Sequence, residues 1–277
     1  MASSYSIGRL FGIPIRLHVT LLIFLALLAL SNALAAGWQG MLYGLVYAVG
    51  LFTGVVLHEI GHSLVARAKG ARILEILLLP IGGMAKLSAM PKRPADEIQI
   101  ALAGPAVSLA LGILGWWWLA PAAGAFNPYL QLVIAELSLT NFLLFLFNLI
   151  PSFPMDGGRV FRAVLTPHLG RLRATQLAAK VGRGFAWLFG LWAVWPVLHG
   201  GQLNFILLLI AYFIHQAAGA EARVAEFEAD YARHAQAGGA WQIPDADVQV
   251  GPPPYARPAA PPPRARGIFD DLLHKWR

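Results

Sequence analysis

Three residues in the second long apolar stretch of the chain have the types and spacing of a catalytic metal site. His58, Glu59 and His62 form the pattern His-Glu-x-x-His. On a helix, residues four apart share a face, so both histidines can bind one zinc ion. Glu59 lies beside them and can take a proton from water that the metal has made more acidic. The pattern therefore predicts metal-assisted hydrolysis.

The apolar surroundings make this interpretation more specific than the five-residue pattern alone. Two histidines and a glutamate stand within five residues of each other inside a long apolar segment, 41–66. Each ionisable side chain at membrane depth costs several kcal/mol unless a partner or a function compensates for it. We therefore expect one zinc ion per chain at His58 and His62.

Two histidines leave a zinc site incomplete, so a third protein ligand is expected. The chain has no cysteine, which restricts the choice to His, Asp or Glu. The metzincin extension is excluded, because Val65 and Ala68 stand where it needs Gly and His. Asp156 is favoured, since prolines and glycines in 151–158 break the backbone and let a carboxylate approach the metal. Glu136, in the fourth apolar segment, is the alternative.

The composition indicates that lipid is the solvent for much of the chain. Of 277 residues, 57% are apolar and 13% are charged, and the mean hydropathy is +0.60. Soluble domains are about 25% charged, so these charges are too few to cover a water-soluble core. The net charge of +7 comes from residues between apolar runs, as at the surface of a lipid bilayer. No nucleic-acid-binding signature is present, and no nucleic-acid partner is expected.

Six segments are apolar and long enough for transmembrane helices, each of which takes about 20 residues. They are 17–36, 41–66, 98–119, 130–150, 182–198 and 203–219. The loops 37–40, 120–129 and 199–202 contain no Lys or Arg, so a six-span topology puts every basic residue on one side. We predict an all-α polytopic membrane protein with both termini in the cytosol. A cleaved signal peptide at the first segment is the alternative, because Ala33-Leu34-Ala35 resembles a cleavage site.

The remaining segments complete the predicted organisation. Residues 73–88 are too short to cross a membrane and contain Gly82-Gly83, which predicts short strands at the membrane surface. An irregular re-entrant loop is the alternative there. We predict a six-span domain at 1–219, a charged cytosolic helix at 220–240 and a Pro-rich tail at 241–277. That tail is expected to be disordered. A short amphipathic helix at its end is the alternative to a loose tail there.

Several motifs together resemble those of the site-2 proteases, in the compact six-span prokaryotic branch of that family. They are His-Glu-Ile-Gly-His at 58–62, Ala-Gly-Pro at 103–105, Phe-Asn-Leu-Ile-Pro at 147–151 and Pro-Met-Asp-Gly-Gly-Arg at 154–159. The resemblance implies a zinc-dependent intramembrane endopeptidase in the cell membrane of a prokaryote. It implies His58, His62 and Asp156 as zinc ligands and Glu59 as the general base. Its substrates would be single-span or signal-peptide-like membrane proteins.

The resemblance also implies how a substrate is held. Asn148 would bind the substrate backbone or the oxyanion, and the segment containing Gly82 and Gly83 would pair with an unwound substrate strand. A helix-terminal cap is the alternative for Asn148. Two alternative functions for the whole protein are a metal transporter and a catalytically inactive membrane scaffold. The sequence does not distinguish a monomer from an oligomer or from a complex with a regulatory membrane partner.

Overall fold

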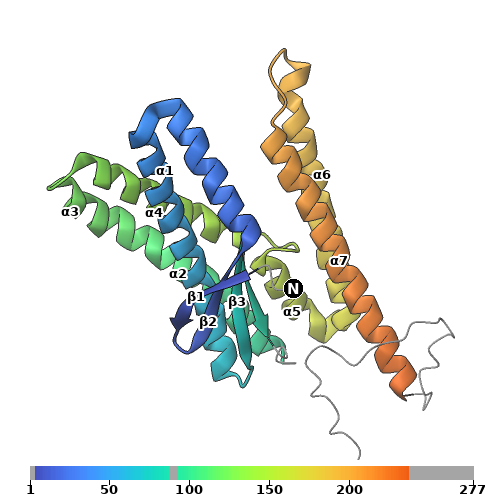
Figure 1. The fold of residues 1–277 in the computed structure, drawn as a ribbon. Coiled ribbons are helices and arrows are strands. Elements are labelled where there is room, and N and C mark those ends of the chain that lie inside the picture. Colours follow the sequence, from blue (N-terminus) through green and yellow to red (C-terminus); the bar gives the residue numbers. More distant parts are fainter. Residues whose placement is uncertain (1–3, 88–92, 237–277) are drawn as a thin grey trace, which may run out of the picture. The chain divides into compact units, whose positions relative to one another are not determined.

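The computed structural model describes residues 4–87 and 93–236, which are mostly helical (Figure 1). The predicted Pro-rich tail and its terminal helix lie outside the described residues. Residues up to Ala232 form one compact unit, and a second unit begins at Arg233. The helical elements are α1 (Val19–Ala68), α2 (Pro94–Leu114), η1 (Gly115–Leu119), α3 (Ala120–Gly124), α4 (Pro128–Asn148), α5 (Asp156–Leu169), α6 (Arg171–Leu198) and α7 (Phe205–Gln236).

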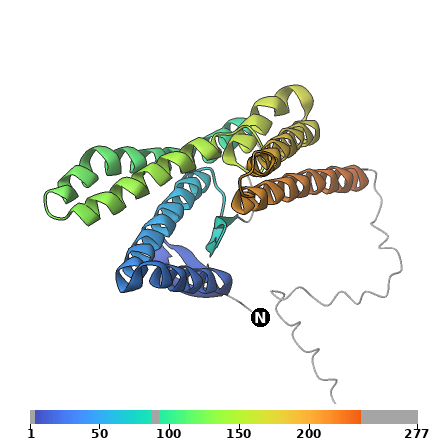
Figure 2. The same ribbon diagram turned by 90° about the horizontal axis from the view of Figure 1, so that it is seen from above.

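Five helices in the described part of the chain are long and apolar enough to cross a membrane. They are Val19–Ala68, Pro94–Gly124, Pro128–Asn148, Arg171–Leu198 and Phe205–His234. The first, α1, has 50 residues, or about 75 Å of helix, against roughly 30 Å for the hydrocarbon core of a bilayer. Its backbone is non-helical at Ala36 and Gly37, where the ribbon turns back (Figure 1 and Figure 2). The predicted spans 17–36 and 41–66 fall on the two halves of this bent helix.

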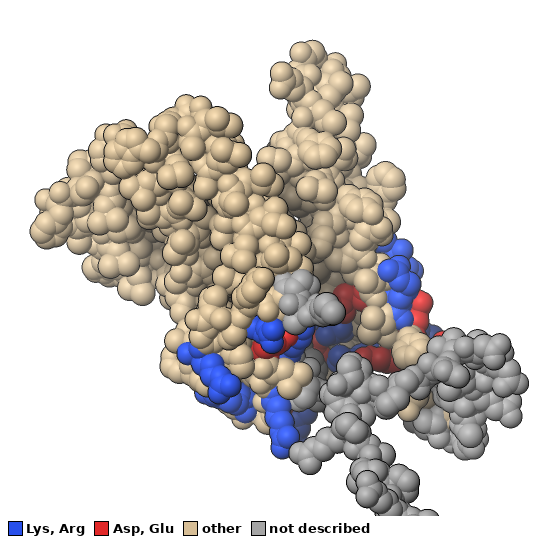
Figure 3. All heavy atoms as spheres, in the orientation of Figure 1, with Lys and Arg blue, Asp and Glu red and all other residues tan. Residues whose placement is uncertain are grey.

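The surface of these helices is strongly apolar. Trp117, Trp187 and Leu191 are each 68% exposed, which would be costly in water because apolar surface of this extent is rarely left uncovered. On the face shown in Figure 3, charged side chains gather at one end of the helical region, and the rest of the helical surface is uncharged. This separation of charged from apolar surface is what a lipid solvent requires.

A four-stranded sheet lies beside α1. Its strands are β1 (Ser4–Leu10), β2 (Ile13–His18), β3 (Ile73–Leu79) and β4 (Gly82–Leu87), in the spatial order β1-β2-β3-β4. β2 and β3 are parallel, and the other two pairs are antiparallel. Ile13, Ile15, Ile76 and Leu78 pack with Leu21 and Ile60 of α1 in one buried cluster. The strands predicted within 73–88 are confirmed as β3 and β4, and the alternative of an irregular re-entrant loop is wrong. The sequence analysis did not predict β1 and β2.

Two features of the second half of the chain go beyond the sequence prediction. Residues 156–169, expected to connect two spans, form the amphipathic helix α5. α6 and α7 run side by side (Figure 1 and Figure 2), with buried alanines on both helices packed around Phe153. α7 continues without interruption from the last predicted span into the charged segment that follows it.

Candidate metal centre

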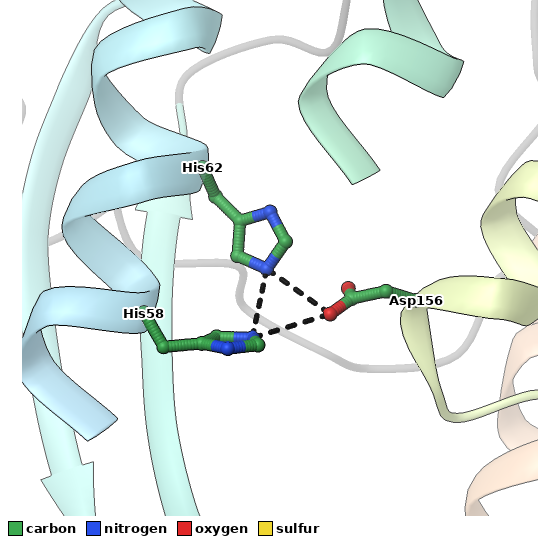
Figure 4. A group of neighbouring side chains, drawn as sticks. All are labelled: His58, His62 and Asp156. Carbon is green, nitrogen blue, oxygen red and sulfur yellow. Dashed lines mark hydrogen bonds and ion pairs between the residues drawn. The ribbon is translucent and has the colours of Figure 1, made fainter. Parts of the chain in front are cut away.

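Three predicted ligands meet at one point in the structure (Figure 4). His58 and His62 come from consecutive turns of α1, and Asp156 is the first residue of α5. The Nε2 atoms of the histidines lie 3.1 Å apart, and Oδ2 of Asp156 lies 3.3 Å from that of His58 and 3.1 Å from that of His62. All three residues are buried, with exposures of 5%, 8% and 9%. Within the described ranges 4–87 and 93–236, these three side chains form the one group of His, Asp or Glu that could hold a metal ion.

The geometry and the donor set fit zinc. Two ligand atoms of a tetrahedral zinc site, each about 2.0–2.1 Å from the ion, lie about 3.3 Å from each other, close to the three distances observed here. Nδ1 of His58 lies 2.8 Å from the Ser108 hydroxyl, and Nδ1 of His62 lies 2.7 Å from the Ile100 carbonyl oxygen. These contacts occupy the Nδ1 atoms and direct both Nε2 atoms to the shared point, as in known histidine–zinc sites.

Close contact between α1 and α2 explains why small residues flank the histidines. A Cβ at Gly61 would lie 2.8 Å from the Ala103 carbonyl oxygen, and one at Gly104 would lie 2.7 Å from Nε2 of His58 and overlap Nε2 of His62. A side chain at either position would separate the helices or displace the ligands. The Ala-Gly-Pro motif at 103–105 thus forms the surface of α2 against which the histidines pack.

The broken backbone after α4 places Asp156. Phe153 and Met155 are buried against α6 and α7, which holds the connecting segment in place. A Cβ at Gly157 would overlap carbonyl oxygens of this segment, and one at Gly158 would lie 2.6 Å from the Phe153 nitrogen. The first turn of α5 can pack onto the segment only because both residues are glycine, so Asp156 stands at a fixed point beside α1.

The two histidines favour the charged form of the Asp156 carboxyl group. Burial by itself would raise its pKa, but hydrogen bonds with His58 and His62 outweigh burial and hold the pKa below its ordinary value. An ionised carboxylate supplies the negative charge that a dication needs in a buried site, so the protonation state and the position of Asp156 both suit a metal ligand.

A buried ion pair that the sequence analysis did not single out joins α2 to α5. Arg162 donates through Nε to Glu97 at 2.8 Å and also through Nη2, and its guanidinium lies 5.0 Å from the centre of the Phe153 ring. Arg171 donates to the other oxygen of Glu97 at 3.1 Å. Glu97 lies one turn before Ile100, so the same part of α2 contacts His62 and the helix that carries Asp156. No helix was predicted at 156–169, so these charges could not be paired from their positions along the chain.

The other predicted site residues lie in different settings. Glu59 is half-buried and accepts a hydrogen bond from the Ala85 main chain at 3.2 Å. Gly82 and Gly83 begin β4. Asn148 is the last residue of α4, and its Nδ2 donates to the Leu144 carbonyl oxygen at 3.0 Å.

Glu136, the alternative third ligand, lies away from the histidines. It accepts a hydrogen bond from the Tyr43 hydroxyl, and the group that can hold a metal contains Asp156 instead. The geometry therefore favours Asp156, as the broken backbone at 151–158 predicted.

Comparisons with known proteins point to a family of zinc metalloproteases. The model of peptidase family M50 matches residues 46–127 and 122–189. A zinc metalloprotease of Methanocaldococcus jannaschii is 39% identical over 82% of this chain and 63% of its own length. Stage IV sporulation protein FB of Bacillus subtilis is 27% identical over 61% of this chain and 62% of its own. The solved structure of a site-2 protease from M. jannaschii superposes with a TM-score of 0.58 at 36% identity, covering 79% of this chain and 95% of that one.

The chain belongs to peptidase family M50, the family of the site-2 proteases. Its apolar helices and these relatives identify it as an integral membrane protein, and the relatives and the ligand group identify zinc as its metal. The chain spans about three fifths of the length of the curated relatives it matches, 63%, 62% and 59% for the first three.

Proposed function

We propose that this chain is a zinc-dependent endopeptidase that cleaves membrane proteins within or beside their spanning helices. The observation that carries the proposal is the meeting of His58, His62 and Asp156 within 4.8 Å, with Glu59 on the same turn of α1 as His58. A metal transporter would need polar groups along a path through several helices, whereas these side chains converge on one buried point. An inactive scaffold would have no need of an intact ligand set.

In the proposed reaction each residue has a separate role. His58, His62 and Asp156 hold the zinc ion, which, when bound, polarises the scissile carbonyl and makes water more acidic. Glu59 takes a proton from the attacking water and delivers it to the departing amine nitrogen. The buried setting of the ligands strengthens these electrostatic interactions, because little water is present to screen them.

Strand β4 offers a place for the substrate to bind. It is the last strand of the sheet, and the Glu59 side chain lies against it. An extended substrate segment pairing with β4 near Gly82 and Gly83 would gain main-chain hydrogen bonds that a lipid solvent cannot supply. Asn148, at the end of α4 just before the segment that leads to Asp156, would donate to the substrate backbone or to the developing oxyanion.

For topology, we propose six crossings, with the two halves of α1 as separate crossings and both termini in the cytosol of a prokaryotic cell. The lack of Lys and Arg in 37–40, 120–129 and 199–202 supports this arrangement. Reporter fusions within 37–40 should report the outside, and fusions after residue 230 the inside. A fusion after 230 that reports the outside would contradict it.

The central experiment compares wild type with Glu59→Gln on a panel of single-span and signal-peptide-like substrates. Both proteins should bind zinc fully, because Glu59 is not a ligand, and Glu59→Gln should cleave about 100- to 10,000-fold more slowly. Cleavage products separated by gel and identified by mass spectrometry give the readout. Equal cleavage by both proteins would contradict the proposed function.

Substrate helicity provides a second test. An intact helix satisfies its own backbone groups and hides each carbonyl, so it must unwind before it can pair with β4. Gly or Pro beside the cleavage site should speed cleavage, and Leu or Ala there should slow it. Rates that do not change across such a series would contradict binding by strand pairing.

A further inference from the structure

The carboxylate of Glu59 lies on the edge of the sheet. The Ala85 N–H donates to Oε2 of Glu59 at 3.2 Å. Ala85 is opposite Ile76 in the antiparallel pair of β3 and β4, and β4 is the outermost strand. Because an N–H directed at Glu59 is directed away from β3, it belongs to the edge of β4 that no strand of the sheet covers. Glu59 therefore already bonds to the edge at which we place the substrate.

Gly83 is the residue that lets β4 come this close. A Cβ there would lie 2.6 Å from Cγ of Glu59 and 3.1 Å from Cγ1 of Val55, and the first distance is shorter than real Cβ contacts allow. Gly82 differs: its Cβ would meet nothing within 4 Å, but its φ of +135° favours glycine. The turn between β3 and β4 thus accounts for Gly82, whereas the room needed by Glu59 accounts for Gly83.

We propose that β4 positions the general base, with the Ala85 N–H holding the Glu59 carboxylate and the bare backbone of Gly83 giving it space. This inference rests on the proposed function, because it concerns Glu59 acting as the base. In a strand, N–H groups two residues apart point to the same side, so the Gly83 N–H is on the same edge as that of Ala85. A substrate strand that pairs at Gly83 would therefore lie directly beside Glu59. In this arrangement β4 sets the position of the substrate and that of the base.

Gly83→Ala tests the space around the base. The added methyl group points at Glu59, while the N–H and C=O groups of Gly83 itself remain available for pairing. We expect kcat to fall about 10- to 100-fold, the effect of losing one hydrogen bond to a charged group, with a smaller change in KM and unchanged zinc content. A rise in KM with an unchanged kcat would overturn the proposal, because it would show that Gly83 serves substrate binding alone.

A double variant separates this role from a general disturbance of the sheet. In Glu59→Gln the base is already lost, so adding Gly83→Ala should leave the residual rate unchanged. If Gly83→Ala lowers kcat by the same factor in both backgrounds, it acts independently of Glu59 and the proposal is wrong. If wild type and Glu59→Gln cleave equally, the proposed function itself fails; if they differ and Gly83→Ala keeps the wild-type kcat, this inference alone fails.

A main-chain change tests the hydrogen bond directly. Replacing Ala85 with lactic acid exchanges its N–H for an ester oxygen, and the same backbone change at Met84, with its side chain kept, is the matched control. Met84 is opposite Leu77, and its N–H points to β3, since neighbouring N–H groups in a strand alternate. The ester at 85 should lower kcat about tenfold or more with little change in thermal stability, and the ester at 84 should lower thermal stability and leave kcat near wild type. Equal losses of kcat at both positions would overturn the proposal.

Discussion

Asp156 and Glu136 are both acidic side chains within the apolar body of the chain, but their surroundings differ. Asp156 meets two histidines that come from another helix, and it is 9% exposed. Glu136 is half-buried between two helices and pairs with Tyr43, while Tyr47 and Thr140 form a second pair one turn further along, at 2.7 Å. These two pairs link α1 to α4, as polar side chains do between membrane helices.

The difference shows what a ligand needs besides depth in the membrane. Glu136 lies within a regular helix, so its side chain can reach only the neighbouring helix face. Asp156 follows a backbone break and begins a new helix, which lets its carboxylate point at α1 from a third direction. Convergence of separate segments therefore distinguishes the metal centre from the polar contacts between α1 and α4.

The largest expected difference is between neutralising one acid and neutralising the other. Loss of a hydrogen bond that supports a metal ligand typically reduces metal affinity about 10- to 100-fold. Asp156→Asn removes a charged ligand itself, so it should reduce zinc affinity by a larger factor. Glu136→Gln should leave zinc content close to wild type. His58→Ala, which removes a nitrogen ligand, should lose most of the zinc. Metal analysis of purified proteins gives the readout, and a reversed order for the two acids would make Glu136 the third ligand.

A glycine substitution tests the packing behind the ligands. A Cβ at Gly104 overlaps the imidazole of His62, so Gly104→Ala should displace the histidines and lose most bound zinc. Gly184→Ala is a matched control, because it also lies within a helix but its Cβ would meet nothing within 4 Å. The control should keep its zinc and gain about 0.5–1 kcal/mol in stability, the usual preference of a helix for Ala. Full zinc occupancy in Gly104→Ala would show that the site tolerates a wider gap between α1 and α2.

The candidate metal ligands could be predicted to lie together because their signals are local. His58 and His62 are four residues apart on one helix, and the prolines and glycines around Asp156 indicate a break without reference to tertiary structure. The strands in 73–88 were predictable for the same reason. By contrast, Ser108 and Ile100 contact the histidines only because α2 crosses α1, and a one-dimensional pattern does not contain that crossing.

Pairing between segments far apart in the chain explains why β1, β2 and α5 were not predicted. β1 and β2 precede an apolar run, but they become strands by pairing with each other and with β3, more than fifty residues away. α5 carries Arg162 toward a glutamate 65 residues earlier, and its sequence is too polar and too short to be predicted as a span. Non-local pairing of this kind determined the elements that were missed.

The hydroxyl of Ser108 should have a smaller effect than the ligands themselves. It lies 2.8 Å from Nδ1 of His58, and Ser108→Ala should reduce zinc affinity about 10- to 100-fold by releasing the orientation of that ring. Ser138→Ala removes the hydroxyl of another buried serine, which donates to the Ile134 carbonyl oxygen within α4, and should leave zinc affinity unchanged. Competition with a zinc chelator measures both affinities, and equal affinities would show that the rest of the fold suffices to orient His58.

The smallest effect is expected from the contacts between α1 and α4. Tyr43→Phe removes the hydroxyl that donates to Glu136 and should lower stability by about 0.6 kcal/mol, the average measured for hydrogen bonds between membrane helices, and by no more than about 1.7 kcal/mol. Zinc affinity should stay at its wild-type value, because the ligands are positioned by α2 and α5 rather than by these pairs. Thermal unfolding in detergent measures the first quantity and chelator competition the second. If Tyr43→Phe weakened zinc binding as much as Ser108→Ala does, the Tyr43–Glu136 pair would be coupled to the metal site through α1. The metal centre and the α1–α4 contacts would then not be independent.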